Sequence, residues 1–126
     1  MNSSFKDLTV YKKDFSLAME IFEKSKKFSK EETYSLTDQI RRSSRSVCGA
    51  IGEGDRKRMY EAHFISKISD ADMENSETQV WLDFALECKY ILKEEHKEFL
   101  NKSEEVGKML YHMIEYPEKY LRKSDK

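Results

Sequence analysis

The sequence has few of the residues that interrupt helices, with four glycines and a single proline, Pro117, in 126 residues. This scarcity excludes a sheet with many tight turns and favours long helices joined by short loops. The chain also lacks any stretch rich in proline, glycine or serine that would divide it, so we expect one domain over residues 1–126. The predicted fold class is all-α.

Cysteine and long apolar runs are scarce as well. Cys48 and Cys88 have neither the C-x-x-C spacing of a redox or zinc site nor the density of a disulfide scaffold. We interpret both as small, reduced, apolar residues. Nowhere are there the roughly 18 consecutive apolar residues that a membrane span needs, and Met1 to Val10 lacks the apolar run of a signal peptide. We therefore expect a soluble, cytoplasmic protein with no membrane partner.

The motifs of catalysis and cofactor binding are missing too. None of His63, His96 and His112 follows a glutamate by three positions, and no two are four residues apart. These spacings exclude the di-iron pattern of helix bundles and the H-E-x-x-H zinc motif. The chain has no G-x-S-x-G, no P-loop and no complete G-x-G-x-x-G. We predict no catalytic residue, no metal and no cofactor, and so a protein that is not an enzyme.

A globally basic surface is also excluded, because the formal net charge is only −1. Positive charge is instead concentrated between residues 39 and 58. This segment contains two acidic residues, Glu53 and Asp55, and six basic ones. The basic residues are Arg41, Arg42, Arg45, Arg56, Lys57 and Arg58. This stretch is the strongest candidate for contact with an anion.

Hydrophobic periodicity predicts four helices, over residues 6–27, 35–54, 60–92 and 94–116. Ser4 is a candidate cap of the first helix, Ser35 with Asp38 resembles a capping box of the second, and Pro117 ends the fourth. Residues 117–126 form a charged tail, which we expect to fray. Four helices with short joints predict an up-down-up-down four-helix bundle.

Each helix has an apolar face that predicts a core. The residues are Leu8, Tyr11, Phe15, Ala18, Met19 and Phe22 on the first, Leu36, Ile40, Val47 and Ile51 on the second, Phe64, Ile68, Ala71, Leu82 and Leu86 on the third, and Phe99, Val106, Leu110, Met113 and Ile114 on the fourth. The polar pair Asn75 and Thr78 interrupts the third face. Gly49 and Gly52 predict a close approach by a neighbouring backbone, and Gly54 a left-handed helix end.

A second apolar stripe appears on two of the helices. It consists of Val10, Leu17 and Ile21 on the first helix and Met73, Val80, Phe84 and Ile91 on the third. A helix in a small bundle needs only one apolar face, so these stripes predict the interface of a homo-oligomer. The alternative is that they are exposed apolar residues of the kind that most protein surfaces carry.

The arginines of the second helix allow two interpretations. Arg41 and Arg45 are one helical turn apart, and guanidinium groups on one surface can follow a nucleic-acid backbone by binding its phosphates. Ordinary salt bridging is the alternative, because Asp38 lies three residues before Arg41 and four before Arg42. The sequence pattern leaves both interpretations open.

The same residues carry a resemblance to a known family. The string Gln39-Ile-Arg-Arg-Ser-Ser-Arg-Ser-Val, the ending Ile51-Gly-Glu-Gly54 and the basic Arg56-Lys-Arg58 are similar to the signature of the proteins encoded in intervening sequences of bacterial 23S ribosomal RNA. Phe5 to Val10 resembles that family's opening, and Glu77-Thr-Gln79 its third-helix segment.

The resemblance implies a four-helix bundle that assembles into a homopentamer. A related branch serves as the accessory protein of diversity-generating retroelements, beside a reverse transcriptase and nucleic acid. The resemblance therefore supports RNA or DNA binding through the six basic residues between 41 and 58. The alternative is a protein-interaction scaffold, or a reverse-transcriptase accessory subunit that does not itself touch nucleic acid.

Overall fold

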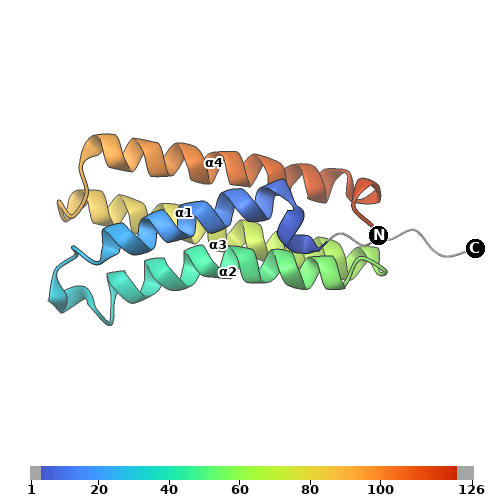
Figure 1. Cartoon of the computed structure of the whole chain (residues 1–126), viewed down its shortest axis with the longest axis horizontal. Helices are drawn as coiled ribbons and strands as arrows, with labels where there is room; N and C mark the ends of the chain where they lie inside the picture. Colours follow the sequence, from blue (N-terminus) through green and yellow to red (C-terminus); the bar gives the residue numbers. More distant parts are fainter. Residues whose placement is uncertain (1–3, 122–126) are drawn as a thin grey trace, which may run out of the picture.

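The computed structural model describes residues 4–121 and contains four long helices. They are α1 (Thr9–Ser25), α2 (Leu36–Arg56), α3 (Glu61–Glu87) and α4 (Lys93–Glu115). Figure 1 shows them side by side with alternating direction, so that both ends of the described chain lie at one end of the bundle. Each helix packs against the next, and α4 returns to α1. The predicted all-α, up-down-up-down bundle is confirmed.

The helix that opens the chain begins later than the sequence suggested. Ser4 caps a short 3-10 helix, η1 (Phe5–Asp7), instead of α1: its Oγ accepts from the Lys6 backbone N–H at 3.1 Å, and Asp7 accepts from the Ser4 N–H at 3.2 Å. This reciprocal capping box closes one turn of chain. α1 therefore starts at Thr9 and not at residue 6.

The start of α2 also uses a different cap from the predicted one. A second 3-10 helix, η2 (Lys30–Glu32), precedes it, and the Glu32 carboxylate accepts from the Ser35 hydroxyl at 2.6 Å and from the Leu36 N–H at 3.3 Å. The Ser35 side chain makes no capping bond of its own. The carboxylate of Glu32, which precedes the helix, therefore caps the first N–H groups of α2. The predicted capping box of Ser35 and Asp38 is not formed.

At its other end α2 continues through Gly54 to Arg56, so the predicted left-handed ending at Gly54 is wrong. Gly54 is required for packing: a methyl group there would lie 2.8 Å from Ile68 Cδ1 on α3. Gly52 faces the Phe5 ring, whereas a methyl group at Gly49 would meet no neighbouring element of the described chain within 4 Å. The close approach predicted for Gly49 is therefore absent, and the closest one falls at Gly54.

The one left-handed non-glycine residue among residues 4–121 is Lys89, with φ 66°. The Tyr90 N–H bonds to the Ala85 carbonyl at 2.9 Å and the Lys89 N–H to the Leu86 carbonyl at 2.9 Å. This pattern is a Schellman motif, which ends a helix without needing glycine when the context holds the residue in place. α3 therefore stops at Glu87, short of the predicted residue 92.

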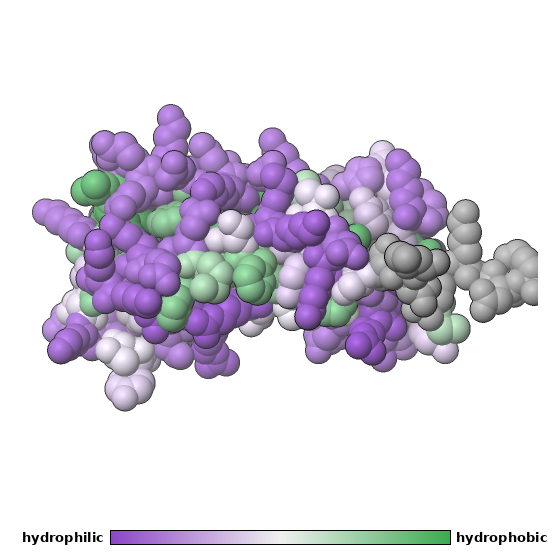
Figure 2. Space-filling view, in the orientation of Figure 1, coloured by the Kyte–Doolittle hydropathy of each residue, from purple (hydrophilic) through white to green (hydrophobic). Residues whose placement is uncertain are grey.

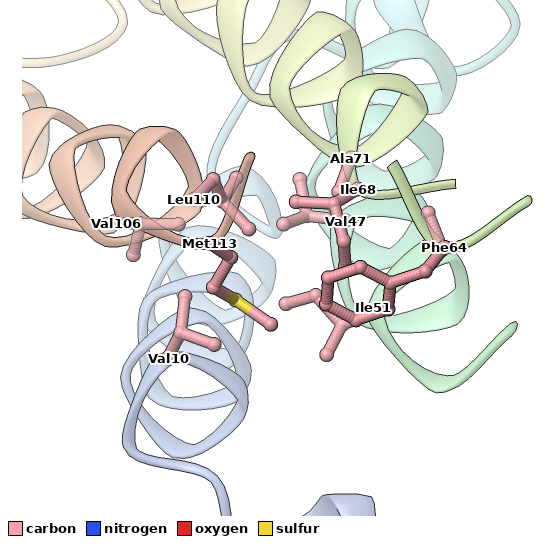
Figure 3. Close-up of a cluster of buried hydrophobic side chains, with 10 residues drawn as sticks. Val10, Val47, Ile51, Phe64, Ile68, Ala71, Val106, Leu110 and Met113 are labelled. Carbon is pink, nitrogen blue, oxygen red and sulfur yellow. The ribbon is translucent and has the colours of Figure 1, made fainter. Parts of the chain in front are cut away.

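The core consists of two apolar clusters. The cluster nearer the chain ends draws on all four helices and contains Val10, Val47, Ala50, Ile51, Phe64, Ile68, Ala71, Val106, Leu110 and Met113 (Figure 3). The second contains Leu17, Ile21, Phe28, Leu36, Ile40, Leu82, Ala85, Ile91 and Phe99. The core faces predicted for α2, α3 and α4 are confirmed in their principal residues.

The buried side of α1 differs from the predicted core face. Ala18 of that face is buried and Leu8 and Tyr11 pack partly against the first cluster, as predicted, but the centre of the buried side lies elsewhere. Val10, Leu17 and Ile21, assigned to an oligomer interface, are buried inside the bundle, and so is Ile91. Phe15 and Met19, assigned to the core, are 52% and 43% exposed. Periodicity shows that a helix has two apolar stripes but does not show which of them meets α2 and α4. Only Met73, Val80 and Phe84 of the predicted interface remain exposed.

Buried polar contacts join neighbouring helices around the middle of the bundle. Ser43 and Thr78 share a hydrogen bond of 2.8 Å between α2 and α3. Between α3 and α4, Asn75 Nδ2 donates to the Ser103 carbonyl at 2.9 Å and the Ser103 hydroxyl donates to Asn75 Oδ1 at 2.8 Å. Sliding one helix along its neighbour would leave these buried groups without partners, so they favour a single register.

The end of the described chain is more structured than a charged tail suggests. Pro117 ends α4 and begins a 3-10 helix, η3 (Pro117–Lys119). Tyr120 and Leu121 then pack on the first apolar cluster, so the expected fraying is wrong for these residues. Residues 122–126 of the predicted tail lie outside the described residues. Within the described chain, no helix has the length and apolar character required to cross a bilayer.

Candidate nucleic-acid interface

Three of the basic residues of α2 lie on the side of the helix that faces away from Ile40 and Val47, and Arg41 lies at the edge of that side, toward α1. At 100° per residue, Arg42, Arg45 and Arg56 share this outer side. Helical rise separates Arg45 from Arg56 by about 16 Å along the axis. The structure therefore divides the six predicted residues into two groups, one near the middle of α2 and one at its C-terminal end.

The first group converges on an aromatic ring of α1. The Cζ atoms of Arg41 and Arg45 lie 4.7 and 5.1 Å from the centre of the Phe22 ring, and Lys26 Nζ lies 5.0 Å from it. Arg41 Nε also donates to Ser25 Oγ at 2.7 Å. We call Arg41, Arg45, Lys26, Phe22 and Ser25 the arginine cluster. Its sequence-predicted members are the two arginines alone.

Arg42 lies beside the arginine cluster but is engaged differently. Its Nη1 is 3.9 Å from Asp38 Oδ2, and 74% of the Arg42 side chain is exposed. An exposed pair at this distance contributes at most about 1 kcal/mol to stability. The salt-bridge alternative for the α2 arginines therefore holds, weakly, for Arg42, while Arg41 bonds to Ser25 and not to Asp38.

The second group, at the end of α2, is only partly free. Arg58 is half-buried; its Nε lies 3.2 Å from Asp55 Oδ1 and donates to the Asp55 carbonyl at 3.1 Å. Arg58 also lines a hollow with Phe64 and Tyr120. Arg56 and Lys57 are exposed and form no ion pair within residues 4–121. Arg58 thus has a structural role, and Arg56 and Lys57 remain accessible.

The surface seen in Figure 2 is mostly hydrophilic, with small hydrophobic areas between the charged side chains.

The sequence matches the family described as 23S rRNA-intervening sequence protein over residues 6–112. The chain belongs to this family.

A solved structure has a similar fold. The crystal structure of a protein of unknown function from the S23 ribosomal protein family of Bacteroides thetaiotaomicron is 31% identical to this chain, with a TM-score of 0.78. The similarity covers 87% of this chain and 98% of that one. No curated protein matches the chain.

The most unusual titratable group of the described chain lies outside the basic residues. Asp14 of α1 is 1% exposed, and the Cys48 thiol of α2 donates to its Oδ2 at 3.1 Å. Burial raises the pKa of Asp14 from 3.8 to about 7, and hydrogen bonding from Cys48 only partly opposes the shift. Burial, together with the adjacent carboxylate, also raises the pKa of the Cys48 thiol.

The sequence did not identify four of the residues described above as site residues. They are Asp14, Phe22, Ser25 and Lys26. A signal for Asp14 was present, since it falls between Val10 and Leu17 at the spacing of the buried α1 stripe. No comparable signal marked the other three, because their role depends on how α1 lies against α2. The two cysteines are free, as interpreted from their spacing.

The three histidines lie far apart along the chain. His96 Nε2 lies 2.8 Å from Asp83 Oδ1, and His112 Nδ1 lies 2.8 Å from the Tyr120 hydroxyl. No group of three or more His, Cys, Asp or Glu side chains within the described part of the chain is arranged to hold a metal ion. The arginine cluster is therefore the arrangement with the clearest chemical capacity, which is the binding of an anion.

Proposed function

We propose that this protein is a non-enzymatic, oligomeric helix bundle that binds RNA or DNA phosphates through the outer side of α2. The observation that carries the proposal is the state of Arg41 and Arg45. Neither forms an ion pair within residues 4–121, and both are held against Phe22. A guanidinium group in this position keeps hydrogen-bond donors for a phosphate.

Several lysines of the bundle are in a different state. Ion pairs join Lys13 to Glu105 at 3.3 Å, Lys24 to Glu95 at 2.6 Å, Lys67 to Glu53 at 3.5 Å and Lys102 to Glu20 at 2.7 Å. These pairs neutralise positive charge on other sides of the molecule. The positive charges of Arg41 and Arg45 have no such partner among residues 4–121, which favours them as the place where a polyanion would bind.

Reversing the charge of both arginines tests the proposal. We expect the wild type to bind a short RNA or DNA duplex at low ionic strength and to release it as salt is added. Arg41→Glu with Arg45→Glu should lower the affinity at least about tenfold and reduce the slope of log K against log salt by about 2, since each phosphate contact contributes about 0.9. Fluorescence anisotropy of a labelled duplex measures both quantities.

A control with the same change in net charge is available on α4. Lys97 and Lys108 are exposed there, and Lys97→Glu with Lys108→Glu should leave the affinity close to that of the wild type. Equal loss in the two double variants, or no salt-dependent binding by the wild type, would contradict the proposal. A protein partner that stays bound after nuclease treatment would favour the scaffold or reverse-transcriptase accessory role instead.

The oligomeric part of the proposal is supported by apolar surface on opposite sides of the bundle. Phe15 and Met19 are exposed on α1, and Met73, Val80 and Phe84 on α3. Within residues 4–121, α1 and α3 make no close backbone approach, because each packs on α2 and α4. A surface on one side that meets a different surface on the other gives a head-to-tail contact, which forms a ring when the rotation between subunits closes and an open filament when it does not.

Multi-angle light scattering tests the assembly. A ring should have a mass that is a fixed multiple of the 15.0 kDa chain, with a pentamer expected from the family resemblance. A monomeric mass at micromolar concentration would rule out the assembly. The nucleic-acid measurement above is independent of this result.

A further inference from the structure

We infer that α1 supplies half of the phosphate site, because Phe22 and Ser25 hold Arg41 and Arg45 in position for the ligand. The inference rests on the proposed nucleic-acid binding and identifies the residues that prepare the protein for it. It also moves the site from the outer side of α2 to the junction of α1 and α2. The ligand chemistry is the phosphate group, here that of a nucleic-acid backbone.

Ser25 fixes the Arg41 side chain through a relay of two hydrogen bonds. Arg41 Nε donates to Ser25 Oγ at 2.7 Å, and the Ser25 hydroxyl donates to the Phe22 carbonyl at 2.8 Å. Ser25 is 2% exposed, so its side chain has a single environment. Within residues 4–121 the terminal nitrogens Nη1 and Nη2 of Arg41 have no hydrogen-bond acceptor, which leaves this end of the guanidinium group for a ligand.

Phe22 brings the three cations together. All three lie within 5.1 Å of the ring centre, at distances typical of cation–π contacts. The ring attracts each cation, but the cations repel one another. Glu23 pairs with Lys26 at 3.2 Å, whereas neither Arg41 nor Arg45 forms an ion pair with a carboxylate of the described chain. An anion placed against them would remove this repulsion.

The arrangement reduces the entropy lost on binding. A free arginine side chain loses rotamer freedom when it binds, at a cost of about 0.5–1.5 kcal/mol for each immobilised side chain. Arg41 and Arg45 are already restrained by Phe22 and Ser25, so less freedom remains to be lost. Lysine could not replace them, because an ammonium group lacks the planar fork that stacks on a ring while bonding to a phosphate.

The test uses variants that keep the charge and remove the restraint. Phe22→Leu keeps an apolar side chain without the ring, and Arg41→Lys with Arg45→Lys keeps both charges without the planar group. We expect each to weaken binding of a labelled RNA duplex about five- to tenfold at constant ionic strength. Ser25→Ala, which removes the acceptor of Arg41 Nε, should weaken it about threefold.

Matched controls lie outside the arginine cluster, outside the outer side of α2 and outside the proposed oligomer surface. Tyr34→Leu removes an exposed ring that carries no cation in the described chain, and Lys97→Arg exchanges one exposed cation of α4 for another. Both should bind within about twofold of the wild type, because neither touches the restrained groups. Circular dichroism and thermal unfolding of every variant establish that a loss of binding does not come from a loss of fold.

The outcomes separate this inference from the proposal beneath it. Reversing the charge of Arg41 and Arg45 could abolish binding while Phe22→Leu and the double lysine variant bind like the wild type. In that case the positioning role of Phe22 and Ser25 is wrong and the nucleic-acid function stands. If the wild type does not bind, both are wrong. If inorganic phosphate binds the wild type as tightly as the duplex does, the cluster is a site for free phosphate and the nucleic-acid source is overturned; if it displaces the duplex only far more weakly, the nucleic-acid backbone is supported as the ligand.

Discussion

Replacing Leu17 by aspartate is expected to unfold the protein, whereas the same replacement at Phe84 is expected to leave the bundle intact. Leu17 is 1% exposed and belongs to the second apolar cluster, while Phe84 is 54% exposed on α3. The sequence pattern placed both residues on an oligomer interface. The two variants therefore test the reassignment of the α1 faces directly.

The magnitudes explain why the outcomes should differ. Loss of a buried leucine side chain costs about 2–5 kcal/mol, and an unpaired carboxylate in the core costs several more. The total is comparable with the stability of a typical domain, about 5–15 kcal/mol. At Phe84 the carboxylate stays in water, and the expected cost is about 1 kcal/mol or less.

Thermal unfolding followed by circular dichroism measures the difference. Leu17→Asp should show no cooperative helix-to-coil transition, and Phe84→Asp should unfold near the temperature of the wild type. If the proposed ring uses α3, Phe84→Asp should also reduce the mass measured by light scattering to that of one chain. A folded, dissociated Leu17→Asp would show that Leu17 lies on the interface after all and that the α1 faces are assigned wrongly.

Asp14→Asn is expected to stabilise the protein at neutral and alkaline pH. In the unfolded chain the Asp14 carboxyl has a pKa near 3.8, and in the bundle burial raises it to about 7. The folded state therefore binds the proton more tightly than the unfolded state between these two values. This difference stabilises the fold fully below the unfolded pKa, and the stabilisation is lost as the pH rises to about 7.

The size of the effect follows from linkage. The difference between a pKa of 3.8 in the unfolded chain and one of about 7 in the bundle corresponds to a free energy of about 4 kcal/mol between acid and neutral pH. An asparagine carries no charge at any pH and removes this dependence. Its amide N–H groups need acceptors in the same buried place, at a cost of about 1–3 kcal/mol, so we expect a net gain of about 1–3 kcal/mol above pH 7.

Urea unfolding of both proteins across the pH range checks this expectation. The difference between variant and wild type isolates Asp14, because carboxylates such as Glu32 and Glu95, whose pKa hydrogen bonds lower, are present in both. Glu104→Gln changes an exposed carboxyl of α4 and serves as the control, with a difference near zero at every pH. A difference for Asp14→Asn that does not grow between pH 4 and pH 7 would contradict the assigned burial.

Much of the fold follows from local patterns that act along one helix. α2 has a single apolar side, formed by Ile40, Val47 and Ile51. For such a helix, periodicity alone identifies the face that packs in the core. Asn75 and Thr78 were recognisable as polar residues at core positions, because the buried residues on either side keep the same spacing. The helix boundaries were less well predicted, since Glu32 and Lys89 act through hydrogen bonds that follow no simple pattern.

The candidate site was also only partly predictable from the sequence. The concentration of arginines on α2 is a property of the sequence, and it was sufficient to suggest an anion as ligand. That Arg58 is tied to Asp55 while Arg41 rests on Phe22 depends on side-chain conformation and on a neighbouring helix. Residues from α1 could not be assigned to the site before the two helices were placed together.

By itself, the sequence determined the all-α class, the four helices, the core faces of three of them, the local excess of positive charge and the family. Tertiary structure alone decided which side of α1 is buried, why Gly54 is a glycine, and that Asp14 meets Cys48. The physical reason is that periodicity and composition act within one segment of chain. Burial, hydrogen bonding across helices and the stacking of arginines on Phe22 depend on contacts between segments that lie far apart in sequence.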